Sequence, residues 1–336
     1  MAERAQAIAS FLAAAGWDKA RLSPLAGDAS FRRYLRLDGA GGRAMLMDAP
    51  PPQEDVRPFL AVARLLHAMA LSAPRILAED SAAGLLLLED FGDGTFTRLL
   101  AAGAAEEPLY ALAVDVLIAI NRRFAGAAAD FLPPYDEARL LAEAALLVDW
   151  YLPAITGVPV DPALRQSYLD LWRELLPAAC AVPQTLVLRD YHVDNLMRLD
   201  DRQGLEVCGL LDFQDAVRGP MSYDLVSLLE DARRDVPAVL AEAMRERFLA
   251  GFPALDRAAF DRSYALLGAQ RNCKIIGIFT RLHRRDGKPG YLRHIPRVWR
   301  WLEQDLRHPA LAPLGRWLDR HIPPPARRAL PEGASL

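Results

Sequence analysis

Two carboxylates and one amide lie at a spacing that could support phosphoryl transfer. The chain contains LRDYHVDN at 188–195, followed by LLDFQDAVRGP at 210–220. Phosphoryl transfer needs an oriented acceptor hydroxyl, a nearby base and metal ions that neutralise phosphate charge. Asp190 could serve as the base, while Asn195 and Asp212 offer oxygen ligands that suit Mg²⁺. Each residue alone could instead occupy a turn or a helix cap, so only their joint order and spacing favours a site.

The elements that must position these residues change in character along the chain. After an opening helix within 1–20, short apolar runs separated by glycine-rich turns predict antiparallel strands over 22–50, with GAGG (39–42) as a hairpin turn. Apolar spacing predicts a helix over 53–71, and two further strands are expected within 73–80 and 84–94.

From about residue 103, long helical patterns dominate, and they continue to about residue 321. Two strand-like runs interrupt them, at 185–199 and 206–213, and both carry the polar residues named above. The sequence therefore predicts an α+β chain with a small β-rich N-lobe (1–92), a large helical C-lobe (93–325) and a loose tail (326–336). A cleft is expected between the lobes.

The D-x-x-x-x-N and D-F elements, together with GPMSYDLVSLL (219–229), resemble the aminoglycoside phosphotransferase and choline kinase superfamily, relatives of protein kinases. The resemblance implies a two-lobed, protein-kinase-like fold and an ATP-dependent, Mg²⁺-requiring kinase that acts on an alcohol. It makes Asp190 the catalytic base, and Asn195 and Asp212 the metal ligands. Asp224, at the start of a predicted helix, is expected to cap that helix or to brace the catalytic loop.

Two N-lobe segments match places where such kinases hold the nucleotide. GDASFRR (27–33) resembles the phosphate-covering turn, and LLLLEDFG (85–92) resembles the hinge whose backbone pairs with adenine. The alternatives are an ordinary hairpin turn for the first segment, and a buried strand followed by a turn for the second. The nucleotide-binding residues implied by the resemblance are Ser30, Arg32, Arg33, Glu89 and Phe91.

One part of the family pattern is missing, because no lysine lies near Met47, where these kinases grip the phosphates. The chain has only Lys19, Lys274 and Lys288. The glutamate that usually pairs with the lysine in mid-helix is also absent, since Glu54 falls in the first turn of the predicted helix. We expect an arginine to replace the lysine, Arg33 or Arg32 first and Arg64 second.

A wider set of segments resembles bacterial anomeric kinases of N-acetylmuramate and N-acetylglucosamine over roughly residues 20–320, among them GDASFRRY, PPYDEARLL and GAQRNCKIIGIF. This resemblance implies ATP-dependent phosphorylation of the sugar C1 hydroxyl, in a cell-wall recycling route that feeds a uridylyltransferase. Arg271 could meet the lactyl carboxylate of such a sugar. Each candidate acceptor contact could equally be a surface or supporting residue; the candidates are His192, Asp194, Gln214, Asp215 and Arg271.

Other functions stay open at this point. The acceptor could be another small alcohol, such as an aminoglycoside, homoserine or choline, and the missing lysine also permits a catalytically dead nucleotide-binding protein. The net charge of −3 gives no basic field for nucleic acid. No leader pattern and no membrane-length apolar run is evident, and the three cysteines lack metal or disulfide spacing, so we predict a cytoplasmic protein.

Overall fold

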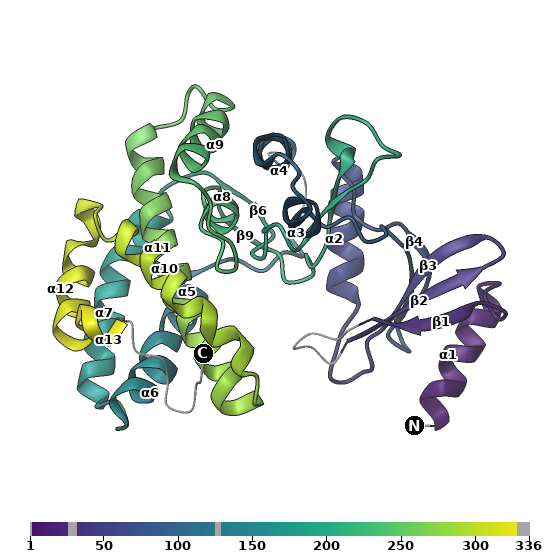
Figure 1. Cartoon of the computed structure of the whole chain (residues 1–336), viewed down its shortest axis with the longest axis horizontal. Helices are drawn as coiled ribbons and strands as arrows, with labels where there is room; N and C mark the ends of the chain where they lie inside the picture. The colour runs from purple at the N-terminus through teal and green to yellow at the C-terminus, as the bar shows by residue number, and fades with distance from the viewer. Residues whose placement is uncertain (1, 26–31, 125–128, 328–336) are drawn as a thin grey trace. The chain divides into compact units, whose positions relative to one another are not determined.

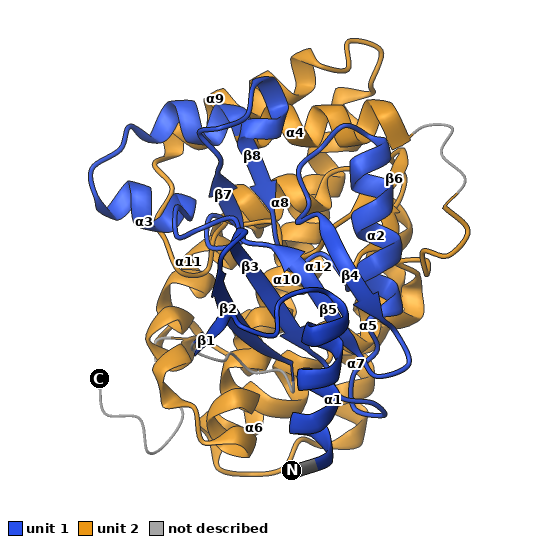
Figure 2. Cartoon of the chain, turned by 90° about the vertical axis from the view of Figure 1, so that its right-hand side faces the viewer, with its two compact units in different colours: residues 1–112, 193–215 blue, residues 113–192, 216–336 orange. Residues whose placement is uncertain are grey.

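The structure is a computed structural model that describes residues 2–25, 32–124 and 129–327. It contains two compact units, coloured separately in Figure 2. Unit 1 comprises residues 1–112 and 193–215, and unit 2 comprises 113–192 and 216–336. The chain thus returns to unit 1 after entering unit 2. The predicted lobe boundary near residue 92 stays a prediction, and most of the predicted tail lies outside the described residues.

Unit 1 is built on the predicted antiparallel sheet (Figure 1). Five strands lie in the order β1-β2-β3-β5-β4, and a separate two-stranded sheet pairs β7 with β8. The predicted hairpin is confirmed, since Gly39 pairs with Gly42 across the turn. The elements of unit 1 are α1 (Ala2–Ala14), β1 (Arg21–Pro24), β2 (Arg33–Gly39), β3 (Gly42–Asp48), α2 (Arg57–Ala68), β4 (Ile76–Asp80), β5 (Leu85–Glu89), α3 (Phe96–Ala101), β7 (Leu196–Arg198), the 3₁₀ helix Gly204–Val207 and β8 (Cys208–Leu210).

Alternation of apolar and polar residues in the strands buries one face of this sheet under α1. Leu12 of α1 packs against Leu37, Leu46 and Leu87 of the sheet. Helix α2 is shorter than the predicted 53–71, because the Asp55 carboxylate accepts a hydrogen bond from the Arg57 N–H (2.9 Å) and so marks its start.

Unit 2 is mainly helical, which confirms the expected fold class. Its elements are α4 (Glu106–Phe124, which begins in unit 1), α5 (Glu137–Ala144), the π-helix Leu147–Tyr151, α6 (Leu152–Thr156), α7 (Pro162–Ala179), β6 (Gln184–Val187), β9 (Val217–Pro220), α8 (Tyr223–Leu229), α9 (Ala238–Ala250), α10 (Arg257–Asp286), the 3₁₀ helices Pro289–His294 and Pro309–Leu311, α11 (Ile295–Asp305), α12 (Ala312–His321) and α13 (Pro324–Arg327).

Helix α10 organises the core of unit 2, because its middle stretch from Ser263 to Gly277 is buried. Strand β9 was missed in the sequence, where only two strand-like runs were recognised in this part. Its sequence, VRGP, contains glycine and proline, which are depleted in strands. It nevertheless pairs with β6 from Val187↔Val217 to Gln184↔Pro220.

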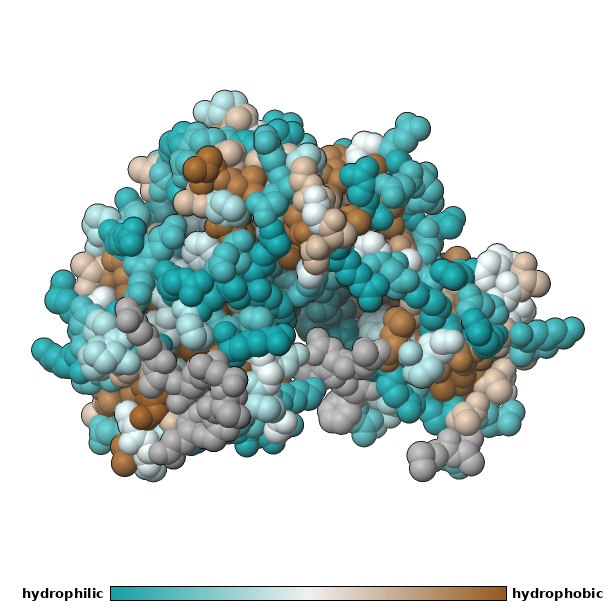
Figure 3. Space-filling model, in the orientation of Figure 1, coloured by the Kyte–Doolittle hydropathy of each residue, from teal (hydrophilic) through white to brown (hydrophobic). Residues whose placement is uncertain are grey.

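Within the described residues, no helix combines the length and apolarity that a bilayer span requires. Figure 3 shows hydrophilic residues in teal over much of the drawn face, with smaller hydrophobic patches in brown.

Candidate active site

Asn195 and Asp212 are brought together in unit 1 by the hairpin-like pair β7 and β8. Asn195 immediately precedes β7 and Asp212 follows β8 by two residues, with Leu196 opposite Leu210 in the register. The Leu211 N–H donates to the Asn195 carbonyl (3.0 Å), which extends the pairing toward both side chains. As a result, Asn195 Nδ2 lies 3.4 Å from Asp212 Oδ2.

Asp212 is held at an unusual backbone conformation and points to solvent. Its φ is +58°, a left-handed value that aspartate tolerates better than most residues, and its side chain is exposed. The next residue, Phe213, is fully buried and stacks on Phe59 of α2 with ring centroids 4.8 Å apart. Packing of Phe213 therefore fixes the position of the exposed carboxylate beside it.

The donor set of this pair fits Mg²⁺. One amide and one carboxylate supply hard oxygen ligands, and Mg²⁺ retains several waters instead of demanding a complete protein shell. Among the described residues, no group of three or more histidine, cysteine or acidic side chains is arranged to hold a metal. Gln214 Nε2 donates to Asp212 Oδ1 (2.9 Å) and lies 3.3 Å from Asp215 Oδ2, so Gln214 orients the candidate ligand.

Asp190 belongs to unit 2, where the backbone before it is anchored at several points. The carboxylate of Asp224 accepts hydrogen bonds from the N–H groups of Leu188 (2.6 Å) and Arg189 (2.9 Å). The Ser227 hydroxyl donates to the Arg189 carbonyl (3.2 Å), and Arg189 has a left-handed φ of +70°. The prediction that Asp224 braces this loop is confirmed. Burial raises the pKa of Asp224 to about 7.

The surroundings of Asp190 favour its ionised form. Burial would raise the pKa of this carboxyl, but nearby positive charges, that of Lys274 first, outweigh burial and leave the pKa below its usual value. Arg271 and Arg189 also lower it, as does His192 when its imidazole is protonated. Asp190 is therefore a carboxylate at neutral pH, as a base that accepts a proton must be.

The predicted acceptor residues are divided between the units. In unit 2, His192 and Arg271 are buried; Arg233 Nη1 lies 3.5 Å from His192 Nε2, and Arg271 Nη1 donates to the Glu230 carbonyl at 3.4 Å. Burial lowers the pKa of His192.

The remaining acceptor candidates, Asp194, Gln214 and Asp215, lie in unit 1. Asp194 Oδ1 accepts a short hydrogen bond from the Thr97 hydroxyl at the start of α3. This contact ties Asp194 to unit 1 and suits a supporting role for its carboxylate.

The predicted hinge residues have distinct environments in unit 1. The Phe91 ring contacts Gly209 so closely that an added Cβ would lie 2.9 Å from it, and the Arg202 guanidinium stands 5.1 Å from the ring centroid. The Phe91 backbone N–H and C=O form no hydrogen bond with any described residue.

The Glu89 side chain, in contrast, is engaged. It pairs with Arg202 at 2.5 Å and with Arg75 at 3.2 Å. Burial would raise its pKa, but these arginines lower the pKa below the usual value. Glu89 also borders a cavity of about 770 Å³ lined by His67, Leu71, Arg75, Glu89, Asp201, Arg202, Gln203 and Glu206.

The arginines expected to replace the missing lysine point to different partners. Arg33 forms an ion pair with Asp48 (2.5 Å), and Asp48 forms a second ion pair with Arg4 of α1 (2.6 Å). Arg32 pairs with Glu54 at 3.4 Å, and both side chains are mostly buried. Arg64 pairs with Glu79 at the surface (2.5 Å). Ser30, also predicted to bind nucleotide, lies outside the described residues.

Tyr34 is influenced by the charges of Arg32, Glu54 and Asp212. It stands opposite Met47 in the register of β2 and β3. Burial raises the pKa of Tyr34 to about 12, with smaller influences from the charges of Arg32, Asp212 and Glu54. Arg32 and Asp212 therefore lie within electrostatic reach of one phenol, on the Met47 side of the sheet.

Sequence reasoning overlooked Lys274 and Glu143 as neighbours of the catalytic loop. Lys274 Nζ lies 3.1 Å from Glu143 Oε1, and Glu143 also accepts from Arg189. The signal was present, because Lys274 follows Arg271 by three residues and so shares its face of a helix.

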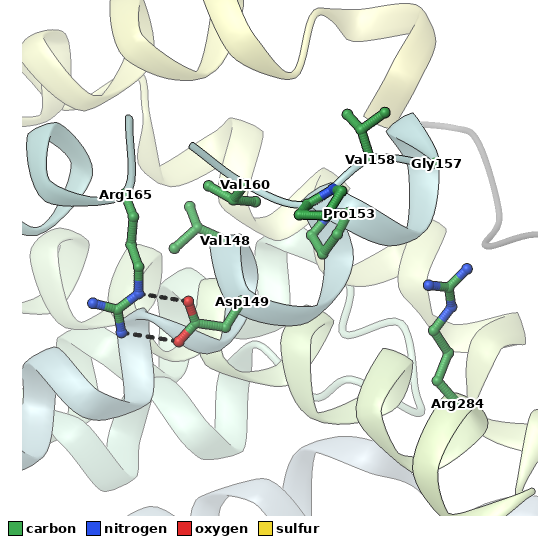
Figure 4. Close-up of a pocket in the computed structure, with 9 residues that line it drawn as sticks. Val148, Asp149, Pro153, Gly157, Val158, Val160, Arg165 and Arg284 are labelled. Carbon is green, nitrogen blue, oxygen red and sulfur yellow. Dashed lines mark hydrogen bonds and ion pairs between the residues drawn. The ribbon is translucent and has the colours of Figure 1, made fainter. Parts of the chain in front are cut away.

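A second cavity, of about 500 Å³, lies in unit 2 and is shown in Figure 4. Val148, Pro153, Val158 and Val160 contribute apolar surface, and Asp149 forms a two-pronged ion pair with Arg165 (2.7 and 3.0 Å). None of the predicted site residues lines it.

Comparison with solved structures supports the protein-kinase-like fold. A GDP complex of aminoglycoside 2'-phosphotransferase-IIIa aligns with a TM-score of 0.61, at 16% identity over 89% of this chain and 97% of that chain. Choline kinase LicA from Streptococcus pneumoniae aligns with a TM-score of 0.62, at 10% identity over 93% of this chain and 99% of that chain. At such identities the likeness concerns the fold.

Curated relatives are much more similar. An N-acetylmuramate/N-acetylglucosamine kinase from Caulobacter vibrioides is 39% identical, over 97% of this chain and 99% of that protein. The protein of the same name from Pseudomonas aeruginosa is 41% identical, over 96% of this chain and 93% of that protein. The profile of the phosphotransferase enzyme family matches residues 21–260. With its kinase-like fold and its D-x-x-x-x-N and D-F elements in place, the chain belongs to the phosphotransferase enzyme family.

Proposed function

We propose that this chain is an ATP-dependent kinase that phosphorylates the C1 hydroxyl of N-acetylmuramate and N-acetylglucosamine. The observation that carries the proposal is the 39–41% identity, over nearly the whole chain, to proteins named as kinases of these two sugars. The product would be a sugar 1-phosphate.

In this proposal Asp190 is the catalytic base. Its carboxylate is ionised at neutral pH, and the backbone before it is fixed by Asp224 and Ser227. The carboxylate orients the sugar hydroxyl and accepts its proton as the oxygen attacks the terminal phosphate in line. No covalent intermediate on the protein is required.

Asn195 and Asp212 would hold Mg²⁺, with Gln214 orienting the Asp212 carboxylate. Bound Mg²⁺ supplies charge neutralisation to the phosphates of ATP. The Phe91 backbone would receive the adenine, since its N–H and C=O have no partner among the described residues.

Arg32 is the arginine that we propose in place of the missing lysine. It pairs with Glu54, which lies just before α2, and its charge and that of Asp212 both act on Tyr34. Arg33 and Arg64 are engaged with Asp48 and Glu79. The guanidinium of Arg32 could hold two phosphate oxygens at once.

The charges around Asp190 argue against a polycationic acceptor. Lys274, Arg271 and Arg189 all lower the pKa of Asp190, so the local potential at the base is positive. An aminoglycoside would bring several ammonium groups toward this potential, whereas an uncharged or anionic sugar would not. The intact Asp190, Asn195 and Asp212 likewise argue against a catalytically dead protein.

The route and the compartment are also proposals. A sugar 1-phosphate has the chemistry of a substrate for a uridylyltransferase, and cell-wall recycling in the cytoplasm would connect the two steps. The three cysteines, Cys180, Cys208 and Cys273, are free thiols, as a reducing compartment would keep them.

The test measures ADP release with Mg-ATP against N-acetylmuramate, N-acetylglucosamine, kanamycin, choline and homoserine. Phosphorus NMR then shows whether the new phosphorus couples to the anomeric proton. The proposal expects a 1-phosphate of both sugars from the wild type and none from Asp190→Asn. Turnover of kanamycin, choline or homoserine alone would refute the amino-sugar acceptor, and nucleotide binding without any turnover would favour the inactive alternative.

A further inference from the structure

A buried carboxylate, Glu143 of α5, connects three segments of unit 2. Glu143 accepts short hydrogen bonds from the Tyr135 hydroxyl and from Arg189 Nη2, and its Oε1 lies 3.1 Å from Lys274 Nζ of α10. Gln270 Nε2 also lies 3.4 Å from the second carboxylate oxygen of Glu143, Oε2. Glu143 is 9% exposed and Lys274 is 8% exposed. A charged lysine is rarely buried to this degree unless it is paired.

The same lysine reaches the segment that anchors the catalytic loop. Lys274 Nζ lies 3.5 Å from the Tyr223 hydroxyl, and Tyr223 is the residue before Asp224. The rings of Tyr223 and Tyr135 meet edge to face with centroids 5.0 Å apart. Lys274 thus contacts Glu143, which precedes the loop in the sequence, and Tyr223, which follows it.

The loop residue held in this way is Arg189. Its N–H donates to Asp224, its carbonyl accepts from Ser227, and its guanidinium pairs with Glu143 while standing 5.8 Å from the Tyr135 ring centroid. These contacts hold both the backbone and the guanidinium of Arg189 and so maintain its left-handed φ of +70°. The backbone conformation of Arg189 sets the direction in which the chain continues to Asp190.

Glu143, Lys274 and Arg189 form a charged hub, and its charge balance leaves one positive charge for Asp190. Glu143 carries one negative charge but faces two cations, Lys274 and Arg189. A fixed surplus cation at a buried position interacts strongly with a neighbouring anion, because water screens it poorly.

We propose that Lys274 is a positioning residue for Asp190: through Glu143 and Tyr223 it holds the 188–190 backbone in place, and it supplies a fixed positive charge that favours the ionised Asp190 carboxylate. The inference rests on the proposed function only in taking Asp190 as the base. It needs no knowledge of which sugar is bound.

The first test compares Lys274→Met with Lys288→Met, which changes the other lysine of unit 2 and lies outside the hub. With Mg-ATP and N-acetylglucosamine, Lys274→Met should lower kcat about 10- to 100-fold, as expected when a catalytic group is misplaced. In a plot of kcat against pH, the fall in activity on the acid side reports protonation of Asp190. This acid limb should move to higher pH, because Asp190 loses the cation that most lowers its pKa. The KM for ATP should stay within about twofold of wild type. Lys288→Met should match wild type.

The second test needs no substrate and follows hydrogen exchange of the peptide that contains the Leu188 and Arg189 amides. Both amides donate to Asp224, so loosening of the brace in Lys274→Met should speed their exchange. If Lys274→Met does not fold, Tyr223→Phe removes only the hydroxyl that Lys274 contacts, and it should accelerate the same amides.

An unmoved acid limb together with wild-type exchange would overturn the positioning role. A raised KM for ATP with an unmoved acid limb would also overturn it and place Lys274 at the nucleotide. If the wild type does not phosphorylate either sugar, the proposed function fails by itself, and the exchange measurement still decides whether Lys274 braces the loop.

Discussion

Two residues with left-handed backbones mark the candidate site, Arg189 just before Asp190 and Asp212 itself. For an L-residue this conformation costs roughly 1–2 kcal/mol, so each must be maintained by its neighbours. Arg189 is maintained by Asp224, Ser227 and Glu143, and Asp212 by the buried ring of Phe213. Two of the three described non-glycine residues with a positive φ thus lie at or beside the residues assigned to chemistry, and the third is Ala70.

Asp212→Asn tests the metal ligand. The substitution keeps the size of the side chain but removes the negative charge that would bind Mg²⁺, so kcat should fall about 100-fold and half-maximal activity should require more Mg²⁺. ADP release measured over a series of Mg²⁺ concentrations checks this. Asp200→Asn, an exposed carboxylate of the same unit that pairs with Arg198, is the control and should keep the wild-type Mg²⁺ requirement. Equal requirements in the two variants would contradict the assignment.

Arg32→Ala tests the replacement for the lysine. Loss of a charge-assisted contact of about 1.5–3 kcal/mol should raise the KM for ATP about tenfold or more and lower kcat as well. Arg33→Ala is the matched control, since Arg33 is its sequence neighbour but pairs with Asp48. Initial rates over a range of ATP concentrations measure both variants. A larger ATP effect for Arg33→Ala would transfer the role to Arg33.

At the scale of elements, α10 packs so closely on the π-helix that a glycine is required. A Cβ on Gly277 would lie 2.3 Å from the carbonyl carbon and oxygen of Leu146, the residue before the π-helix Leu147–Tyr151. The sequence predicts helix across this region but cannot show the widened turn, because a π-turn depends on tertiary packing. Strand β9 was missed for a similar reason, since its pairing with β6 overrides a poor strand composition.

Gly277→Ala should therefore destabilise the protein by about 1–3 kcal/mol, the usual cost of overpacking a core. Denaturant unfolding followed by circular dichroism measures the difference. Gly290→Ala is the control, because a Cβ there meets nothing within 4 Å, and its change should stay within about 0.5 kcal/mol. Similar stabilities for both variants would show that α10 shifts to accommodate the methyl group.

At the scale of the whole molecule, the sequence predicted the α+β class and the order of elements because periodicity and turn residues are local signals. The return of the chain from unit 2 to unit 1 is not encoded in local signals of this kind. The segment 193–215 belongs to unit 1 although it follows part of unit 2 in sequence, so Asn195 and Asp190 are assigned to different units. Motif spacing identified both residues, but it could not reveal the partners that fix them, such as Glu143, 46 residues from Arg189.

The stability of the whole molecule should also depend on a buried acid pair remote in sequence. Glu230 and Asp305 both contact Asn272 of α10, whose Nδ2 donates to Glu230 Oε2 (2.9 Å) and Asp305 Oδ2 (3.0 Å). Burial raises the pKa of Glu230 to about 7 and raises the pKa of Asp305. Tyr264 and Arg271 are the other polar groups that act on Glu230, and both lower its pKa by less than burial raises it.

Because the folded pKa of Glu230 lies above its unfolded value, its contribution to the free energy of unfolding is complete below about pH 4.5 and is lost as pH rises through about 7. Glu230→Gln mimics the protonated acid, since its amide can accept from Asn272 and donate to Asp305. Relative to this variant, the free energy of unfolding of the wild type should fall between pH 4.5 and 8, because the folded state holds the Glu230 proton more tightly than the unfolded chain does. Denaturant unfolding at several pH values measures the difference, with Glu174→Gln on the exposed face of α7 as control. A wild-type loss that Glu230→Gln does not remove would assign the pH dependence to Asp305 instead of Glu230.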